Sequence, residues 1–233
     1  MAGTARSWKR WVVAAGVLAV VLAVGGPYVY IHFIDGKAPA RLDVATRQTT
    51  AGAAGGSASG SLDGTWTAGS GSQAGYRVKE VLFGQDNEAV GRTSAVTGQL
   101  ILTGTQVRSG SFSVDLTKVS SDRQQRDAQF QGRIMDTSSN PTATFKLVRP
   151  IALGSIPASG ATIEATADGQ LTLRGTTRPV TVDVTARRNG NSFQVSGSIP
   201  VTFSDWDIPS PSFGPVTTED HGQIEFLLAF ART

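Results

Sequence analysis

The residue best suited to acid–base chemistry in the C-terminal part of the chain is His221, in the stretch TTEDHGQ with Glu219 and Asp220 beside it. A Ser-His-Asp hydrolase would use such a histidine as its general base. That mechanism also needs a nucleophilic serine, and the chain contains no G-x-S-x-G nucleophile elbow. The polar surroundings therefore favour a solvated loop histidine.

Two other patterns match catalytic or binding motifs only by their letters. Asp205 and Asp207 flank Trp206, but carboxylates two residues apart share one side of a strand, whereas retaining glycosidases need about 5–5.5 Å between opposed groups. GSGSQA at 69–74 resembles a dinucleotide fingerprint, but no helix pattern follows it. The chain has no cysteine and two histidines, which argues against thiolate chemistry and a histidine-rich metal site. We predict no enzymatic activity, no cofactor and no metal.

The main signal is a long alternation of apolar and polar residues, most regular over 169–203. Such a period of two is typical of strands with one apolar face. Asp168-Gly169 and Asn189-Gly190 are typical of tight hairpin turns. A stretch at 118–135 breaks the pattern and predicts a short helix capped by Ser121 or Asp122. We expect strands at 62–68, 74–83, 97–103, 106–116, 142–149, 161–167, 170–174, 179–188, 192–204 and 223–231.

The length of the predicted strands favours a closed barrel over a two-layer sandwich. Strands 179–188 and 192–204 exceed the usual length of about 5–6 residues, and a tight turn joins them. An eight-stranded barrel is just wide enough to hold one slender ligand. The apolar face also includes small residues that would leave space inside: Ala165, Ala167, Gly175, Ala186 and Gly197. The alternative is a solid core in which phenylalanines fill the middle.

Four stretches, TGQLILTG, SDRQQRD, PTATFKL and GQLTLRGTTRPVTVDV, resemble the YceI-like, polyisoprenoid-binding family. The resemblance implies an all-β fold: an elongated antiparallel, lipocalin-like barrel of about eight strands. In the family, a central tunnel holds an isoprenoid lipid, such as an isoprenoid quinone or a polyprenyl lipid. This chain departs from the family at Glu80, where many relatives have histidine, and around Ile134-Met135, where an aromatic pair is common.

Two sets of residues are candidates for binding such a lipid. Arg123, Arg126 and Asp127 are predicted to lie at the tunnel mouth and to contact a head group, although Arg126 and Asp127 could instead be a structural pair that closes one end. Apolar residues of inward parity are predicted to line the tunnel: Tyr76, Val78, Phe112, Val114, Phe145, Val182, Val184, Val195, Phe203 and Phe226.

The N-terminal part of the chain differs in composition from the rest. Residues 11–34 contain no Asp, Glu, Lys or Arg, enough for a helix to cross a bilayer. We predict a cytoplasmic tail at 1–10, a transmembrane anchor at 11–34, a flexible linker at 35–60 and the barrel at 61–233. A cleaved signal peptide, with APA at 38–40 as its cleavage site, is the alternative.

Charge distribution bears on both partners and location. Residues 1–60 hold six Lys or Arg against two Asp or Glu, whereas residues 61–233 hold fifteen against sixteen. The basic excess therefore belongs to the N-terminal part, and we predict that the barrel does not bind nucleic acid. The basic cluster before residue 11 favours a single-pass protein of the cell membrane with its barrel on the extracytoplasmic side. Ala15, Ala19 and Ala23 form a small-residue stripe that could pack against another helix, as in a homodimer.

Together these features predict a membrane-anchored barrel that binds an isoprenoid lipid for carriage or sequestration. The alternative is a structural or partner-binding β-domain with a solid core and no ligand.

Overall fold

The computed structural model describes residues 15–18, 38–44, 62–82, 84–214 and 216–233, of which 15–18 are helical. No helix within these ranges is long and apolar enough to cross a membrane. The predicted cytoplasmic tail, most of the predicted anchor at 11–34 and most of the predicted linker lie outside the described residues. The membrane anchor therefore stays a prediction.

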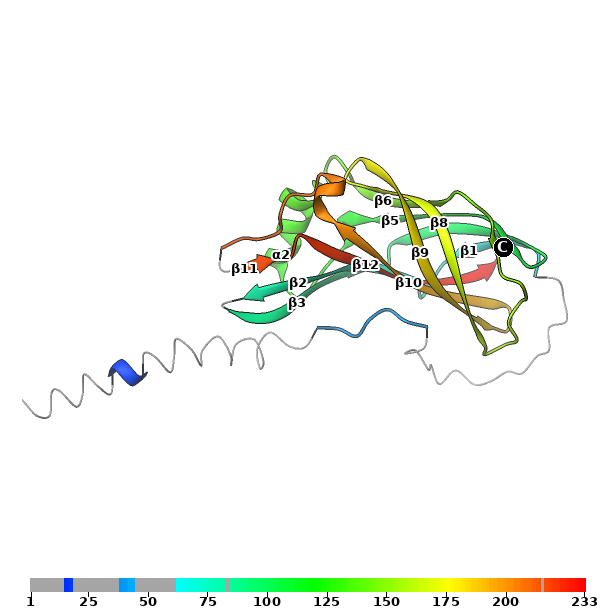
Figure 1. The fold of residues 1–233 in the computed structure, drawn as a ribbon, viewed down its shortest axis with the longest axis horizontal. Helices are drawn as coiled ribbons and strands as arrows, with labels where there is room; N and C mark the ends of the chain where they lie inside the picture. Colours follow the sequence, from blue (N-terminus) through cyan, green and yellow to red (C-terminus); the bar gives the residue numbers. More distant parts are fainter. Residues whose placement is uncertain (1–14, 19–37, 45–61, 83, 215) are drawn as a thin grey trace, which may run out of the picture.

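The described part of the chain folds into an all-β barrel of eight antiparallel strands, as predicted (Figure 1). Each strand pairs with the next around the barrel, and pairing of the last strand with the first closes it. In barrel order the strands are β1 (Gly64–Ala68), β4 (Val96–Thr103), β5 (Gln106–Asp115), β6 (Thr142–Leu147), β8 (Thr162–Leu173), β9 (Thr176–Asn189), β10 (Ser192–Thr202) and β12 (His221–Arg232).

The two ends of this barrel differ, because β12 has two partners on one edge. Its C-terminal residues pair with β1, whereas its first half pairs with β2 (Gln73–Leu82). β2 then forms a long hairpin with β3 (Gln85–Thr93), and β11 (Val216–Thr218) pairs with the end of β2. We call this end of the barrel the mouth end, and the opposite end, where β1 lies and β10 begins, the far end (Figure 1).

Three strands and one turn differ from the sequence-based prediction. β3, β11 and the two-residue β7 (Ile151–Ala152) were not predicted, since they have little apolar alternation. The predicted turn at Asp168-Gly169 is wrong, since β8 runs straight through it and turns at Arg174-Gly175, where both residues have positive φ. A glycine inside a strand often marks a close approach instead of a turn. Gly169 does so, because an added Cβ would overlap the Phe145 ring.

The predicted helical segment is present at the mouth end. It comprises the 3-10 turn η2 (Leu116–Lys118), the helix α2 (Gln124–Gln129) and the π-helical turn η3 (Phe130–Ile134). Arg123 occupies the N-cap position of α2 and its side chain does not cap the helix, so neither predicted cap residue caps it. A further 3-10 turn, η4 (Phe203–Trp206), follows β10 beside the same end.

Residues 38–44, part of the predicted linker, pack on the outside of the barrel. Leu42 and Val44 form a small buried cluster with Leu227, and both Val44 and Leu227 are 0% exposed. The Val44 amide donates to the Ser196 hydroxyl over 3.2 Å. We call residues 38–44 the strap.

Candidate functional site

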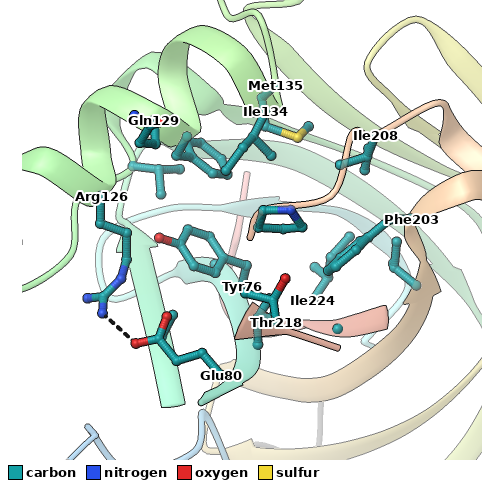
Figure 2. Close-up of a pocket in the computed structure, with 18 of the residues that line it drawn as sticks. Tyr76, Glu80, Arg126, Gln129, Ile134, Met135, Phe203, Ile208, Thr218 and Ile224 are labelled. Carbon is teal, nitrogen blue, oxygen red and sulfur yellow. Dashed lines mark hydrogen bonds and ion pairs between the residues drawn. The ribbon is translucent and has the colours of Figure 1, made fainter. Parts of the chain in front are cut away.

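A cavity of about 820 Å³ occupies the mouth end of the barrel. Its walls come from β2, β12, η4 and the inner face of α2 and η3, which lies over the barrel end (Figure 2). Most of its lining is apolar, including Tyr76, Phe130 and Phe203. This volume lies within the usual range of small-molecule sites, about 300–1,000 Å³.

A second cavity, of about 180 Å³, lies deeper in the barrel. It shares four lining residues with the first, namely Ala74, Val114, Ala143 and Ile224, so the two spaces adjoin across this junction. Thr144 supplies the only polar side chain among the described residues that line the deeper space. The interior therefore changes from partly polar at the mouth end to apolar further in.

Aromatic rings lie against the barrel wall because glycines on the neighbouring strand leave room for them. Tyr76 pairs across strands with Gly91, and Phe226 pairs with Gly197. A Cβ added at Gly91 would overlap the Tyr76 ring, and one at Gly197 would lie 2.6 Å from the Phe226 ring. Flat packing of this kind keeps the rings out of the central space.

All the residues predicted to line a tunnel lie on the walls of these cavities. Period-two alternation accounts for their inward direction, since side chains of a strand alternate between its two faces. Whether they contact a ligand stays a prediction. The mouth cavity is lined by Tyr76, Val78, Val114 and Phe203, and the deeper one by Phe112, Val114, Phe145, Val182, Val184, Val195 and Phe226.

The predicted mouth residues take different positions. Arg123 and Arg126 line the mouth cavity. Asp127 instead accepts hydrogen bonds from the amide of Ser121 at 2.7 Å and from its hydroxyl at 2.6 Å, which fixes the loop before α2. Arg126 and Asp127 thus bond to different partners.

Arg126 forms an ion pair with a residue that was not predicted to belong to the site. Its Nη2 lies 3.0 Å from Oε1 of Glu80 (Figure 2). Its Nη1 pairs with Asp122. Glu80 is buried and also accepts from the Asn87 side chain at 3.0 Å. Glu80 has the same strand parity as Tyr76 and Val78, so alternation could have placed it on the cavity wall.

Tyr76 joins the apolar lining to this ion pair. Its ring stacks on Phe130 with centroids 5.0 Å apart, and Figure 2 shows its hydroxyl directed toward the side of the cavity where Arg126 lies. Burial raises the pKa of the Tyr76 hydroxyl well above its usual value, although the Arg126 charge opposes the rise. Tyr76 is therefore a neutral hydrogen-bond donor at physiological pH.

Aromatic side chains cluster at the far end of the barrel, and Phe193 and Phe230 among them also line the deeper cavity. Trp66, 1% exposed, packs edge-on against Phe193 with centroids 4.7 Å apart. Its indole nitrogen donates to the Leu62 carbonyl over 3.0 Å. Phe112 and Phe230 pack together beside them, 5.7 Å apart. The larger cavity therefore lies at the mouth end, and the smaller one extends to these aromatic residues.

The residues considered for catalysis do not form a catalytic set. His221 is exposed and bonds to its chain neighbours, with its Nδ1 2.8 Å from Asp220 and its Nε2 3.1 Å from Glu219. Asp205 on η4 and Asp207, the C-cap residue that follows it, are both exposed. In the described part of the chain, no three His, Cys, Asp or Glu side chains gather as a metal site would require.

Comparison with solved structures supports this architecture. A polyisoprenoid-binding domain from Saccharophagus degradans, implicated in plant cell wall breakdown, is 14% identical with a TM-score of 0.59, covering 73% of this chain and 99% of that domain. BcnA from Burkholderia cenocepacia is 24% identical with a TM-score of 0.51, covering 66% of this chain and 95% of BcnA. At these identities the likeness concerns the fold. No curated protein sequence matches the chain.

The family model for the YceI-like domain matches residues 66–230, which span the barrel from β1 to the end of β12. This match covers well over half of the chain and agrees with the closed barrel and the helical segment at its mouth end. The chain therefore belongs to the YceI-like family.

Proposed function

We propose that this protein binds an isoprenoid lipid, a polyprenyl lipid or an isoprenoid quinone, in the barrel interior and carries or sequesters it. The proposal includes a membrane anchor at 11–34 and a barrel on the extracytoplasmic side. The observation that supports it most directly is the gradient inside the barrel, from Tyr76, Glu80 and Arg126 at the mouth end to an apolar inner space. An amphiphile with a polar head and a long apolar tail has the same polarity.

The energetics favour a chain-like apolar ligand. Each CH₂ group that leaves water contributes roughly 0.8 kcal/mol, so a long tail needs no specific polar contact for its affinity. Polar groups at the mouth end can then select the head group. The similar fold of the polyisoprenoid-binding domain from Saccharophagus degradans agrees with this proposal.

The proposal is tested by extracting the full-length protein, purified from its native membrane, with organic solvent and analysing the extract by mass spectrometry. We expect a stoichiometric isoprenoid. Adding the identified lipid to delipidated protein should raise the melting temperature, because a ligand that binds only the native state stabilises it by about 2.7 kcal/mol at 100 times Kd.

A matched pair of variants on β9 locates the binding site. Val182→Trp places a large side chain in the deeper cavity, whereas Thr181→Trp places one on the exposed outer face of the same strand. We expect Val182→Trp to lose the long-chain lipid and Thr181→Trp to retain it, with circular dichroism showing both folded. Equal lipid content in the two folded variants would contradict an interior site, and a lack of lipid in the wild-type protein would leave the solid-core, partner-binding function.

A further inference from the structure

The strap covers charged side chains on the outside of the barrel. Arg77 on β2 and Glu225 on β12 point to the outside of the barrel, yet both are buried. They form a close ion pair, with Nε of Arg77 2.6 Å from Oε1 of Glu225. Arg77 also donates to the Pro39 carbonyl over 2.7 Å, and Arg92 donates to the Ala40 carbonyl. Backbone carbonyls of the strap thus complete the hydrogen bonding of these arginines.

The direction of the strap along the barrel is defined by its partners. Pro39 contacts Arg77, which pairs with Gln223 near the start of β12. Val44 contacts Ser196, which pairs with Leu227, four residues further along β12. The first residues of the strap therefore lie nearer the mouth end, and its last residues nearer the far end (Figure 1).

The predicted anchor ends at Ile34, five positions before Pro39, whose carbonyl accepts the hydrogen bond from Arg77. The chain from Ile34 to Pro39 spans at most about 18 Å when fully extended. From Arg77, beside Pro39, β2 continues to Leu82 at the mouth end, a rise of about 17 Å. With Ile34 at the membrane surface, this tether is just long enough for the mouth end to touch the bilayer. It is too short for the far end to reach the bilayer while the strap stays packed on the barrel.

The rim of the mouth end carries exposed apolar side chains. Phe213, which lines the cavity opening, is 55% exposed, and Val81 near the end of β2 is 39% exposed. Leu82 and Val216 lie half-buried between them. Exposed aromatic and aliphatic residues that ring an apolar cavity are typical of a surface that contacts membrane lipid.

We propose that the strap holds the barrel with its mouth end against the bilayer and that the rim around Phe213 and Val81 enters the lipid surface. The inference rests on the membrane anchor that is part of the proposed function. A lipid tail could then pass from the bilayer into the cavity without crossing water. The rim contact is apolar, so it should persist at high salt.

The test uses the full-length chain in phosphatidylcholine vesicles that contain a lipid-borne fluorescence quencher. Because the native chain has no cysteine, single cysteines can carry an environment-sensitive fluorophore. Phe213→Cys reports on the rim, and Asn191→Cys, in the β9–β10 turn, reports on the far end. We expect a blue shift and quenching at 213 and neither at 191, in low and high salt alike.

Releasing the strap should abolish this orientation. Val44→Asp places a charge in a fully buried contact with Leu227, so we expect quenching at 213 to fall while the barrel stays folded. Ala40→Ser, at an exposed position of the strap, is the matched control and should leave quenching unchanged. If Val44→Asp does not fold, Leu42→Ser offers a milder release.

The outcomes separate this inference from the lipid-binding proposal. Three results would overturn the orientation even if the extracted protein still contains lipid. They are equal quenching at 213 and 191, quenching only at 191, and unchanged quenching at 213 after strap release. A quenched rim on a protein that contains no lipid would uphold the orientation and contradict lipid binding.

Discussion

The two ends of the barrel are built from the same alternating strands but differ in what they enclose. At the far end, Trp66 packs against Phe193, and Phe193 and Phe230 border a cavity of only about 180 Å³. At the mouth end, Tyr76 and Phe203 border a cavity of about 820 Å³. Inward-facing aromatic residues are therefore no guide to whether a barrel is filled.

The neighbours of each ring account for the difference. Tyr76 and Phe226 each face a glycine across the strand pair and lie flat against the wall. Trp66 instead meets the ring of Phe193 on β10 edge-on. The additional strands β2, β3 and β11 also lie at the mouth end, where α2 and η3 cover it from one side (Figure 1). The following predictions, from the largest expected effect to the smallest, test this difference between the ends.

Removing the central aromatic residue of the far end should have the largest effect on stability. Trp66→Ala should lower the free energy of unfolding by about 3–5 kcal/mol, because it leaves a void in a close-packed region. Phe203→Ala, at the mouth cavity, should cost about 2 kcal/mol, since one side of its ring already borders empty space. Urea unfolding measures both. Equal losses would show that the two ends are packed alike.

Adding one methyl group to the barrel wall should push an aromatic ring into the central space. Gly197→Ala would bring a Cβ to 2.6 Å from Phe226 and drive its ring into the deeper cavity. We expect a loss of about 1–3 kcal/mol in stability and a shorter bound chain by mass spectrometry. Gly110→Ala is the control, because its nearest contact would be an ordinary 3.6 Å to Phe112. A wild-type lipid profile in Gly197→Ala would show that Phe226 does not limit the bore.

The polar groups of the mouth end should act on the lipid head and not on its tail. Tyr76→Phe removes one hydroxyl and should weaken binding of a polyprenol about fivefold, or about 1 kcal/mol. Binding of squalene, an isoprenoid hydrocarbon without a head group, should not change. Thermal-shift titration with both ligands makes the comparison. A similar loss for squalene would indicate that the substitution altered the cavity shape.

Acid should weaken the packing of the strap on the outside of the barrel. Burial alone would raise the pKa of Glu225, but Arg77 and Arg92 more than offset this and hold it below its usual value. A lowered folded-state pKa contributes stability that is complete above the unfolded value of about 4.3 and is lost as the pH falls through the folded value. Hydrogen exchange in residues 38–44, referenced to the unfolded chain, should therefore rise below about pH 4.

Glu225→Gln provides the control for this pH dependence. The variant keeps the shape of the side chain without its titration, so strap exchange should already be raised at neutral pH and should change little on acidification. If the wild-type strap stays protected at low pH, the ion pair with Arg77 is not what holds it.

The sequence predicted much of the fold because its strands are long and regular. The cavity-facing parity of residues such as Val182 and Val184 needs no knowledge of distant partners, since side-chain alternation is local. A turn was wrongly predicted at Asp168-Gly169 because these are typical turn residues, and only the ring of Phe145 explains Gly169 within a strand. β3 was missed because its sequence, QDNEAVGRT, is mostly polar.

Alternation of residue types along the strands thus determined the barrel and the inward-facing residues by itself. Only the tertiary structure decided which parts of the interior are empty, that Glu80 pairs with Arg126, and that the strap buries Arg77 and Glu225. These properties depend on side chains far apart in the chain meeting in three dimensions. Whether a ring lies against the wall or extends into the central space depends on the residue opposite it on the next strand. That pairing is set by the strand register, which alternation alone does not specify.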